Sequence, residues 1–109
     1  MLFRSIMAGL SCGSVSMMAW EVLKQATDFF VTIPDASVAP SMKLLASGKC
    51  SDAPIEAGES AVAGLAAVMA LCEQPTLRDK VGLNADSRVL LVGTEGATDP
   101  EIYREMLKP

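Results

Sequence analysis

The chain has 109 residues, half of them hydrophobic and 20% charged, with a net charge of −4 at pH 7. This length allows one domain at most, and the composition is more apolar than that of an ordinary globular domain. Its nine Lys and Arg residues form no basic stripe, which excludes a nucleic-acid surface, and no polybasic segment is present for anionic lipid. The chain has too few polar residues to cover all of its apolar ones. We therefore expect a partner subunit or a further piece of chain to cover part of the apolar surface.

The chain contains no histidine, which excludes Ser-His-Asp and Cys-His catalysis. Its cysteines, Cys12, Cys50 and Cys72, are odd in number and widely spaced, so we interpret them as reduced thiols of a cytoplasmic protein and not as a metal site. The apolar N-terminal stretch is interrupted by Ser5 and Gly9, which does not fit a secretory signal. No segment is apolar over the ~20 residues that a membrane helix needs, so we expect no membrane partner.

The first predicted elements are a helix and a short strand. A helix capped by Ser14 or Ser16 and running to about Phe30 has polar side chains along one side and apolar ones along the other. The sequence FFVTIP, residues 29–34, is rich in aromatic and β-branched residues and predicts a strand.

Two helices of different character are predicted in the middle of the chain. Asp35 or Ser37 is expected to cap the first, and Gly48 ends it. The second, residues 59–74, is apolar on every side over most of its length. Such a helix is expected to be buried on every side by neighbouring elements.

The remaining elements complete an alternation of helices and strands. A short helix follows Pro75, the apolar sequence RVLLV (88–92) predicts a strand buried on both faces, and Thr98 or Asp99 caps a last helix. The order helix, strand, helix, helix, strand, helix predicts the α/β class with a parallel sheet. Two or three strands make a poor sheet alone, which again suggests a larger body.

Two short polar segments form the candidate site. Gly93 and Thr94 follow the second predicted strand, and ligands of open α/β sheets gather at the carboxyl ends of strands. Glu59 and Ser60 open the apolar helix, whose free N–H groups would face whatever binds there. If the two segments meet, they form a small polar wall in an apolar body. A simple turn at Gly93 and a helix cap at Glu59 and Ser60 are the alternative interpretations.

Three stretches resemble one enzyme family: SIMAGLSCG (5–13), AGESAVAGLAAV (57–68) and LLVGTEGATDPEIYREML (90–107). Together they look like the C-terminal third of diaminopropionate ammonia-lyase, a pyridoxal-phosphate enzyme of amino-acid metabolism related to the threonine dehydratases. The resemblance implies an α/β fold with a partial three-layer sheet and helices, the C-terminal portion of the large domain of pyridoxal-phosphate fold type II (tryptophan-synthase-β-like). It also implies that residues 1–109 are a single incomplete domain.

The resemblance implies a role for each candidate residue. The family eliminates both amino groups of 2,3-diaminopropionate, giving pyruvate and ammonia. In related lyases a Ser or Thr after the last core strand contacts the pyridine nitrogen of the cofactor, and Thr94, preceded by Gly93, matches that position. Glu59 and Ser60 match a segment that lines the cofactor cleft. Ser14 stands where many relatives have Glu, so no role is carried over to it.

The Schiff-base lysine, the glycine-rich phosphate loop and the catalytic acids of this family lie in its N-terminal two-thirds, and nothing in residues 1–109 replaces them. We therefore assign no catalytic residue here and expect a fragment that is inactive alone. In the complete enzyme the implied cofactor is pyridoxal phosphate, and the implied partners are an amino-acid substrate and further copies in a homo-oligomer such as a dimer. Two alternatives stay open: a non-catalytic, self-associating α/β interaction module, and a fragment of a related threonine or serine dehydratase.

Overall fold

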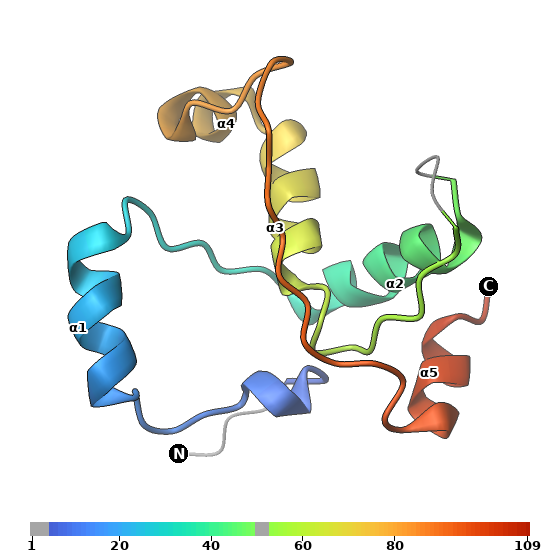
Figure 1. Ribbon diagram of the computed structural model, residues 1–109. Coiled ribbons are helices and arrows are strands. Elements are labelled where there is room, and N and C mark those ends of the chain that lie inside the picture. The colour runs from blue at the N-terminus through green and yellow to red at the C-terminus, as the bar shows by residue number, and fades with distance from the viewer. Residues whose placement is uncertain (1–4, 50–52) are drawn as a thin grey trace.

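The computed structural model describes residues 5–49 and 53–109, and Cys50 lies outside them. The described chain is helical (Figure 1). It contains the 3-10 helices η1 (Ala8–Leu10) and η2 (Asp35–Ser37) and the α-helices α1 (Met17–Ala26), α2 (Val38–Ser47), α3 (Ala63–Cys72), α4 (Pro75–Val81) and α5 (Pro100–Met106). No strand occurs in residues 5–49 and 53–109, so the predicted α/β class with a partial three-layer sheet is wrong.

The two segments that were predicted as strands pack against helices and not against each other. Residues 29–31 line a shallow groove with Leu71 of α3 and Leu77 of α4. Leu91 lies beside Gly64 near the beginning of α3, where a Cβ on the glycine would be 3.3 Å from Leu91 Cδ2. Apolar, β-branched sequence forms a strand only where a second strand completes the hydrogen-bond ladder, and neither segment has such a neighbour within the described chain.

Most helix boundaries follow the capping residues of the sequence. Ser16 begins α1, and its side chain accepts a hydrogen bond from the Ala19 N–H at 3.2 Å. Gly48, with φ 67°, ends α2, and Gly82, with φ 77°, ends α4. The first helix ends at Ala26 and is therefore shorter than predicted.

Asp35 was one of the two expected caps of α2, but its side chain binds elsewhere. Its carboxylate accepts hydrogen bonds from Ser5 Oγ at 2.8 Å and from the Ile6 N–H at 3.0 Å. Ser37, at the N-cap position, makes no capping hydrogen bond with its side chain. Asp35 thus holds the N-terminal segment against the beginning of α2 and helps to place Met7 in the core.

A small core forms where α2, the beginning of α3 and α5 meet the segment before η1. Its buried residues are Met7, Val38, Met42 and Val62. The half-buried side chains packed around them are Ile33, Leu45, Ala57, Ala63, Tyr103, Met106 and Leu107. This core fixes the turn that precedes α3, on which the candidate site depends.

Helix α3 is much less buried than its sequence predicts. Ala66, 2% exposed, is its buried residue, while Gly64 and Cys72 are exposed. Residues 88–93 run along one side of α3 (Figure 1), where Gly64 lies against Leu91 and Gly93 lies against the Ala61 carbonyl oxygen. The prediction of burial on every side is wrong for the described chain, because its other elements do not cover the remaining sides of this helix.

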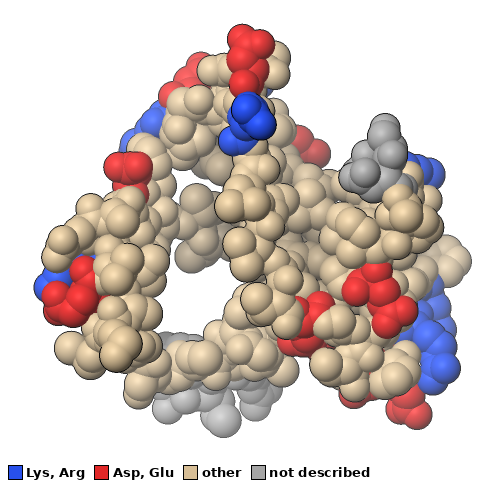
Figure 2. Space-filling view, in the orientation of Figure 1, with Lys and Arg blue, Asp and Glu red and all other residues tan. Residues whose placement is uncertain are grey.

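Helix α1 carries no buried residue and lies apart from the core. The Trp20 ring contacts the Phe30 ring, with centroids 6.3 Å apart. Figure 2 shows an opening through the molecule between α1 and the column formed by α3 and the extended chain beside it. The apolar side of α1 is therefore left without a covering layer in this structure.

The molecule exposes more surface than a compact monomer of its size. Its accessible surface is 8197 Å², against about 5,800 Å² expected for a compact protein of this mass. Its radius of gyration is 15.0 Å, against about 13 Å expected. Large apolar side chains contribute to the excess, among them Leu90, 89% exposed, and Val92, 75% exposed. Within the described residues, no helix has the length and apolarity needed to cross a membrane.

Candidate functional site

Three segments that lie far apart in the sequence meet beside the beginning of α3. We call this region the three-segment junction and define it as Gly9, residues 58–61 and residues 93–98. The Gly58 N–H donates a hydrogen bond to the Glu95 carbonyl oxygen at 3.0 Å. The Gly9 N–H, in η1, donates to Ser60 Oγ at 2.9 Å. The structure thus brings together the two candidate segments and adds the N-terminal segment to them.

Glycines occupy the positions where backbones in the junction approach too closely for a side chain. A Cβ on Gly58 would overlap the carbonyl oxygen of Gly96. A Cβ on Gly93 would lie 2.8 Å from the Ala61 carbonyl oxygen, a distance that real Cβ atoms essentially never show. Neither Gly58 nor Gly93 has a positive φ, so close approach and not a left-handed backbone is what requires glycine here.

Glu59 is buried, with 5% of its surface exposed, and its Oε2 has no hydrogen-bond partner among the described residues. A buried polar oxygen without a partner is costly, so this carboxylate calls for a donor that the described residues do not provide. The N-cap of α3 is Val62, with no side-chain capping hydrogen bond. Neither Glu59 nor Ser60 therefore caps this helix, and that alternative interpretation is wrong.

The two hydroxyl groups of the candidate site differ in their surroundings. Ser60 Oγ accepts the hydrogen bond from Gly9 and keeps its own O–H to donate. The Thr94 side chain is exposed. Both neighbours of Thr94 are held in place. Gly93 lies against the Ala61 carbonyl oxygen, and the Glu95 carbonyl oxygen accepts the hydrogen bond from the Gly58 N–H. Thr94 therefore presents a hydroxyl from a backbone that is fixed on both sides.

A groove of about 300 Å³ opens beside the junction. Gly93 and Glu95 line it from one side, and Ala61 and Gly64 line it from the other. Leu91 extends the apolar part of its wall. A space of this size lies at the low end of the range for small-molecule sites. Of the four candidate residues, Gly93 lines this groove, whereas Thr94, Glu59 and Ser60 are not among its lining residues.

The residues of the junction fit one edge of pyridoxal phosphate. The exposed hydroxyl of Thr94 can donate to a ring nitrogen, and the buried, unpaired oxygen of Glu59 can accept from a polar ligand group. None of the junction residues is a lysine, so the junction itself does not offer the group that would hold the cofactor covalently.

Sequence reasoning missed Gly9, Gly58 and Glu95. Gly9 and Gly58 were read only as parts of longer stretches, although each allows a close contact in the junction. Glu95 had a usable signal, because an acidic residue between Thr94 and Gly96 directly after an apolar run has to find partners nearby. Its side chain accepts a hydrogen bond from the nearby Thr98, but its contacts with Gly58 and Gly9 join segments remote in sequence, which no local pattern indicates.

The chain is similar to two enzymes of known name. The diaminopropionate ammonia-lyase of Escherichia coli (strain K12) is 37% identical over 106 residues, which are 94% of this chain and 27% of that enzyme. The diaminopropionate ammonia-lyase of Salmonella typhimurium (strain LT2) is 32% identical over 107 residues, which are 94% of this chain and 26% of that enzyme. No protein-family model matches the sequence.

The chain spans about a quarter of the length of the curated relatives that it matches. Almost the whole chain is similar to diaminopropionate ammonia-lyases, which confirms the resemblance that the sequence stretches indicated.

Proposed function

We propose that this chain is the C-terminal part of a diaminopropionate ammonia-lyase and supplies the pyridine-nitrogen side of its cofactor site. The observation that carries the proposal is the junction, in which the loop that holds Thr94 meets the turn that holds Glu59 and Ser60. The similarity over 94% of the chain gives this junction its chemical context. Residues 1–109 are then one incomplete domain, consistent with the excess of exposed surface.

Thr94 has the central role in this proposal. Pyridoxal phosphate, when bound, supplies the electron sink for the elimination that turns 2,3-diaminopropionate into pyruvate and ammonia. The Thr94 hydroxyl would donate a hydrogen bond to the ring nitrogen of the bound cofactor and, being neutral, would not protonate it as a carboxylic acid would. Gly93 lets the loop approach the Ala61 backbone, and Glu59 and Ser60 line the same wall. No residue of this chain takes a catalytic role.

The partners follow from the same proposal. The complete enzyme binds an amino-acid substrate and assembles as a homo-oligomer, such as a dimer. We place it in the cytoplasm, since the cysteines of the described chain, Cys12 and Cys72, are free thiols. The isolated 109-residue chain should form no pyruvate from diaminopropionate and pyridoxal phosphate, and turnover by this chain alone would contradict the proposal.

A chimera tests the proposal directly. In the Escherichia coli relative, the 106 matched residues are replaced by the corresponding residues of this chain, and pyruvate formation is measured with saturating cofactor. We expect a folded chimera with the visible absorption of bound pyridoxal phosphate and measurable activity. A chimera that folds but binds no cofactor would overturn the proposal.

A second candidate function is a non-catalytic, self-associating module. The observation in its favour is the excess of roughly 2,400 Å² of exposed surface, which is more than each partner buries in a standard interface. Light scattering separates the two candidates: a defined small oligomer without affinity for pyridoxal phosphate favours the module. A related threonine or serine dehydratase is a further candidate, and the substrate range of the active chimera distinguishes it.

A further inference from the structure

We propose that Glu95 is a positioning residue that fixes the direction of Thr94 by joining all three segments of the junction. The significance of this role for catalysis rests on the proposed function. The positioning role depends only on the contacts of the Glu95 side chain and the Glu95 carbonyl group, so it can be tested without any cofactor.

The side chain of Glu95 contacts each of the other segments. Its Oε1 accepts a hydrogen bond from Thr98 Oγ1 at 3.2 Å, which closes the loop before α5. A Cβ on Gly58 would lie 2.9 Å from the same oxygen. A Cβ on Gly9 would lie 2.9 Å from the other carboxylate oxygen, Oε2. The carboxylate is therefore enclosed by Gly58, Gly9 and Thr98, and the glycines make room for it.

The backbone of Glu95 adds a fourth contact, because its carbonyl oxygen accepts the hydrogen bond from the Gly58 N–H. Thr94 precedes Glu95 directly and is exposed, so its own side chain does not hold the loop. On the other side of Thr94, Gly93 lies against the Ala61 carbonyl oxygen. The orientation of the Thr94 hydroxyl is then set by its two neighbours, and of these only Glu95 has a side chain.

Amide hydrogen exchange of the 109-residue chain, followed by NMR, tests this role. The Gly58 amide reports the contact with Glu95, and the Ala66 amide, bonded to the Val62 carbonyl oxygen at 2.9 Å, reports the core. In Glu95→Ala we expect exchange at Gly58 to speed up by about tenfold or more, and exchange at Ala66 to change by less than about twofold. An unchanged rate at Gly58, or equal acceleration at both amides, would overturn the proposal.

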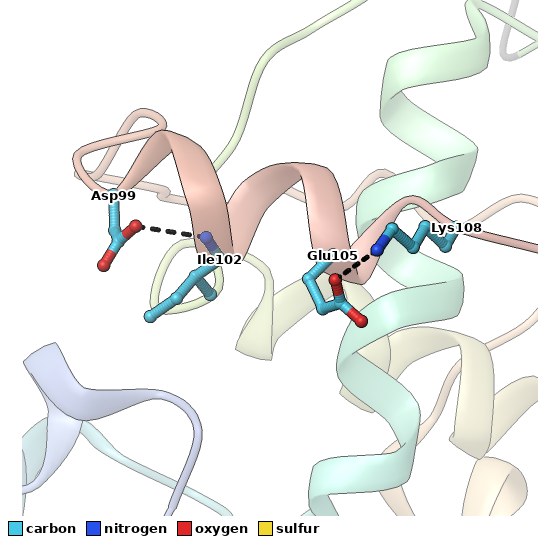
Figure 3. A network of polar contacts seen from close by, with 4 residues as sticks. All are labelled: Asp99, Ile102, Glu105 and Lys108. Carbon is cyan, nitrogen blue, oxygen red and sulfur yellow. Dashed lines mark hydrogen bonds and ion pairs between the residues drawn. The ribbon is translucent and has the colours of Figure 1, made fainter.

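Conservative variants separate positioning from general stability. Glu95→Gln keeps an acceptor oxygen and nearly the same shape, so we expect exchange at Gly58 to stay within about threefold of the parent chain. Acceleration in Glu95→Gln as large as in Glu95→Ala would count against the proposed contacts. The matched control is Glu105→Ala, which removes an exposed carboxylate bound to Lys108 at 2.6 Å (Figure 3) and should change neither rate.

The mobility of the Thr94 methyl group distinguishes positioning of Thr94 from a general contribution of Glu95 to stability. We expect its NMR order parameter to fall in Glu95→Ala while the urea midpoint stays that of the parent chain. An unchanged order parameter overturns the proposal. If Glu95→Ala does not fold, Thr98→Val removes only the side-chain hydrogen bond, and it should lower the same order parameter less strongly. Because these experiments use no cofactor, their outcome for Glu95 does not depend on the outcome of the chimera experiment, which tests the proposed function.

Discussion

The Gly58 N–H and the Glu95 carbonyl oxygen form a 3.0 Å hydrogen bond between the turn before α3 and the loop before α5. Neither segment belongs to a helix, so no regular element enforces this contact. The two backbones meet because Gly58 has no side chain and because the core beneath holds Val62 and Ala57 in place. The candidate site exists through this contact, which makes Gly58 the first residue to test.

Gly58→Ala should separate the two segments. The added Cβ would overlap the Gly96 carbonyl oxygen, and relieving such overlap by backbone shifts typically costs about 1–3 kcal/mol. Urea unfolding monitored by circular dichroism measures the loss. The matched control is Gly96→Ala, because a Cβ on Gly96 meets nothing within 4 Å. Equal stability of the two variants would show that the junction is looser than described.

Met42→Ala should weaken the core. Met42 is 1% exposed and packs between α2 and its neighbours, and truncation of such a side chain costs about 2–5 kcal/mol. Leu90→Ala removes a side chain that is 89% exposed and should change the free energy of unfolding by less than about 0.5 kcal/mol. Thermal unfolding compares the two, and similar losses would contradict the core that α2, α3 and α5 form.

Asp99→Ala should destabilise the beginning of α5. The Asp99 carboxylate accepts hydrogen bonds from the Glu101 and Ile102 N–H groups at 3.1 Å each, the latter drawn in Figure 3, and the loss of an N-cap costs about 1 kcal/mol. Lys108→Ala removes an exposed ion pair at the other end of the helix and should cost at most about half as much. The exchange rate of the Ile102 amide measures the difference, and a larger effect of Lys108→Ala would be the contrary result.

Replacing Leu90 and Val92 by lysine should reduce the apolar surface without unfolding the chain. Both side chains are largely exposed, at 89% and 75%, so charge is tolerated at either position. We expect the double variant to bind less of an apolar dye such as anilinonaphthalene sulfonate, in proportion to the area lost, with an unchanged circular dichroism spectrum. A variant that unfolds would show that these side chains are buried in solution.

Local sequence signals correctly predicted several helix ends, which depend on residues that are close together in the sequence. Ser16, Gly48 and Asp99 mark helix ends in the structure as the sequence indicated. The short helix expected after Pro75 is present as α4 and begins at Pro75 itself, because the missing N–H of proline costs nothing in the first turn. For such residues the deciding hydrogen bond lies within a few positions of the residue itself.

The predictions that failed were those that needed a neighbour. Residues 88–92 have the composition of a strand, and residues 59–74 were predicted as a buried helix, but a strand requires a pairing partner and a buried helix requires elements that cover it. In the described chain residues 88–92 lie along α3 and form no ladder. For the candidate site, the sequence indicated Gly93, Thr94, Glu59 and Ser60, but the link through Glu95 joins remote segments and was visible only in the structure.

The most direct measurement of the central claim is the absorption spectrum of bound pyridoxal phosphate in the chimera with Thr94→Val and Thr94→Ser. We expect Thr94→Val, which loses the hydroxyl, to shift the visible band and to lower kcat by about tenfold or more, consistent with the loss of one hydrogen bond to the cofactor. Thr94→Ser, which keeps the hydroxyl, should retain the parent spectrum and most of the activity. A Thr94→Val chimera with the parent spectrum and parent kcat would contradict the claim that Thr94 faces the cofactor.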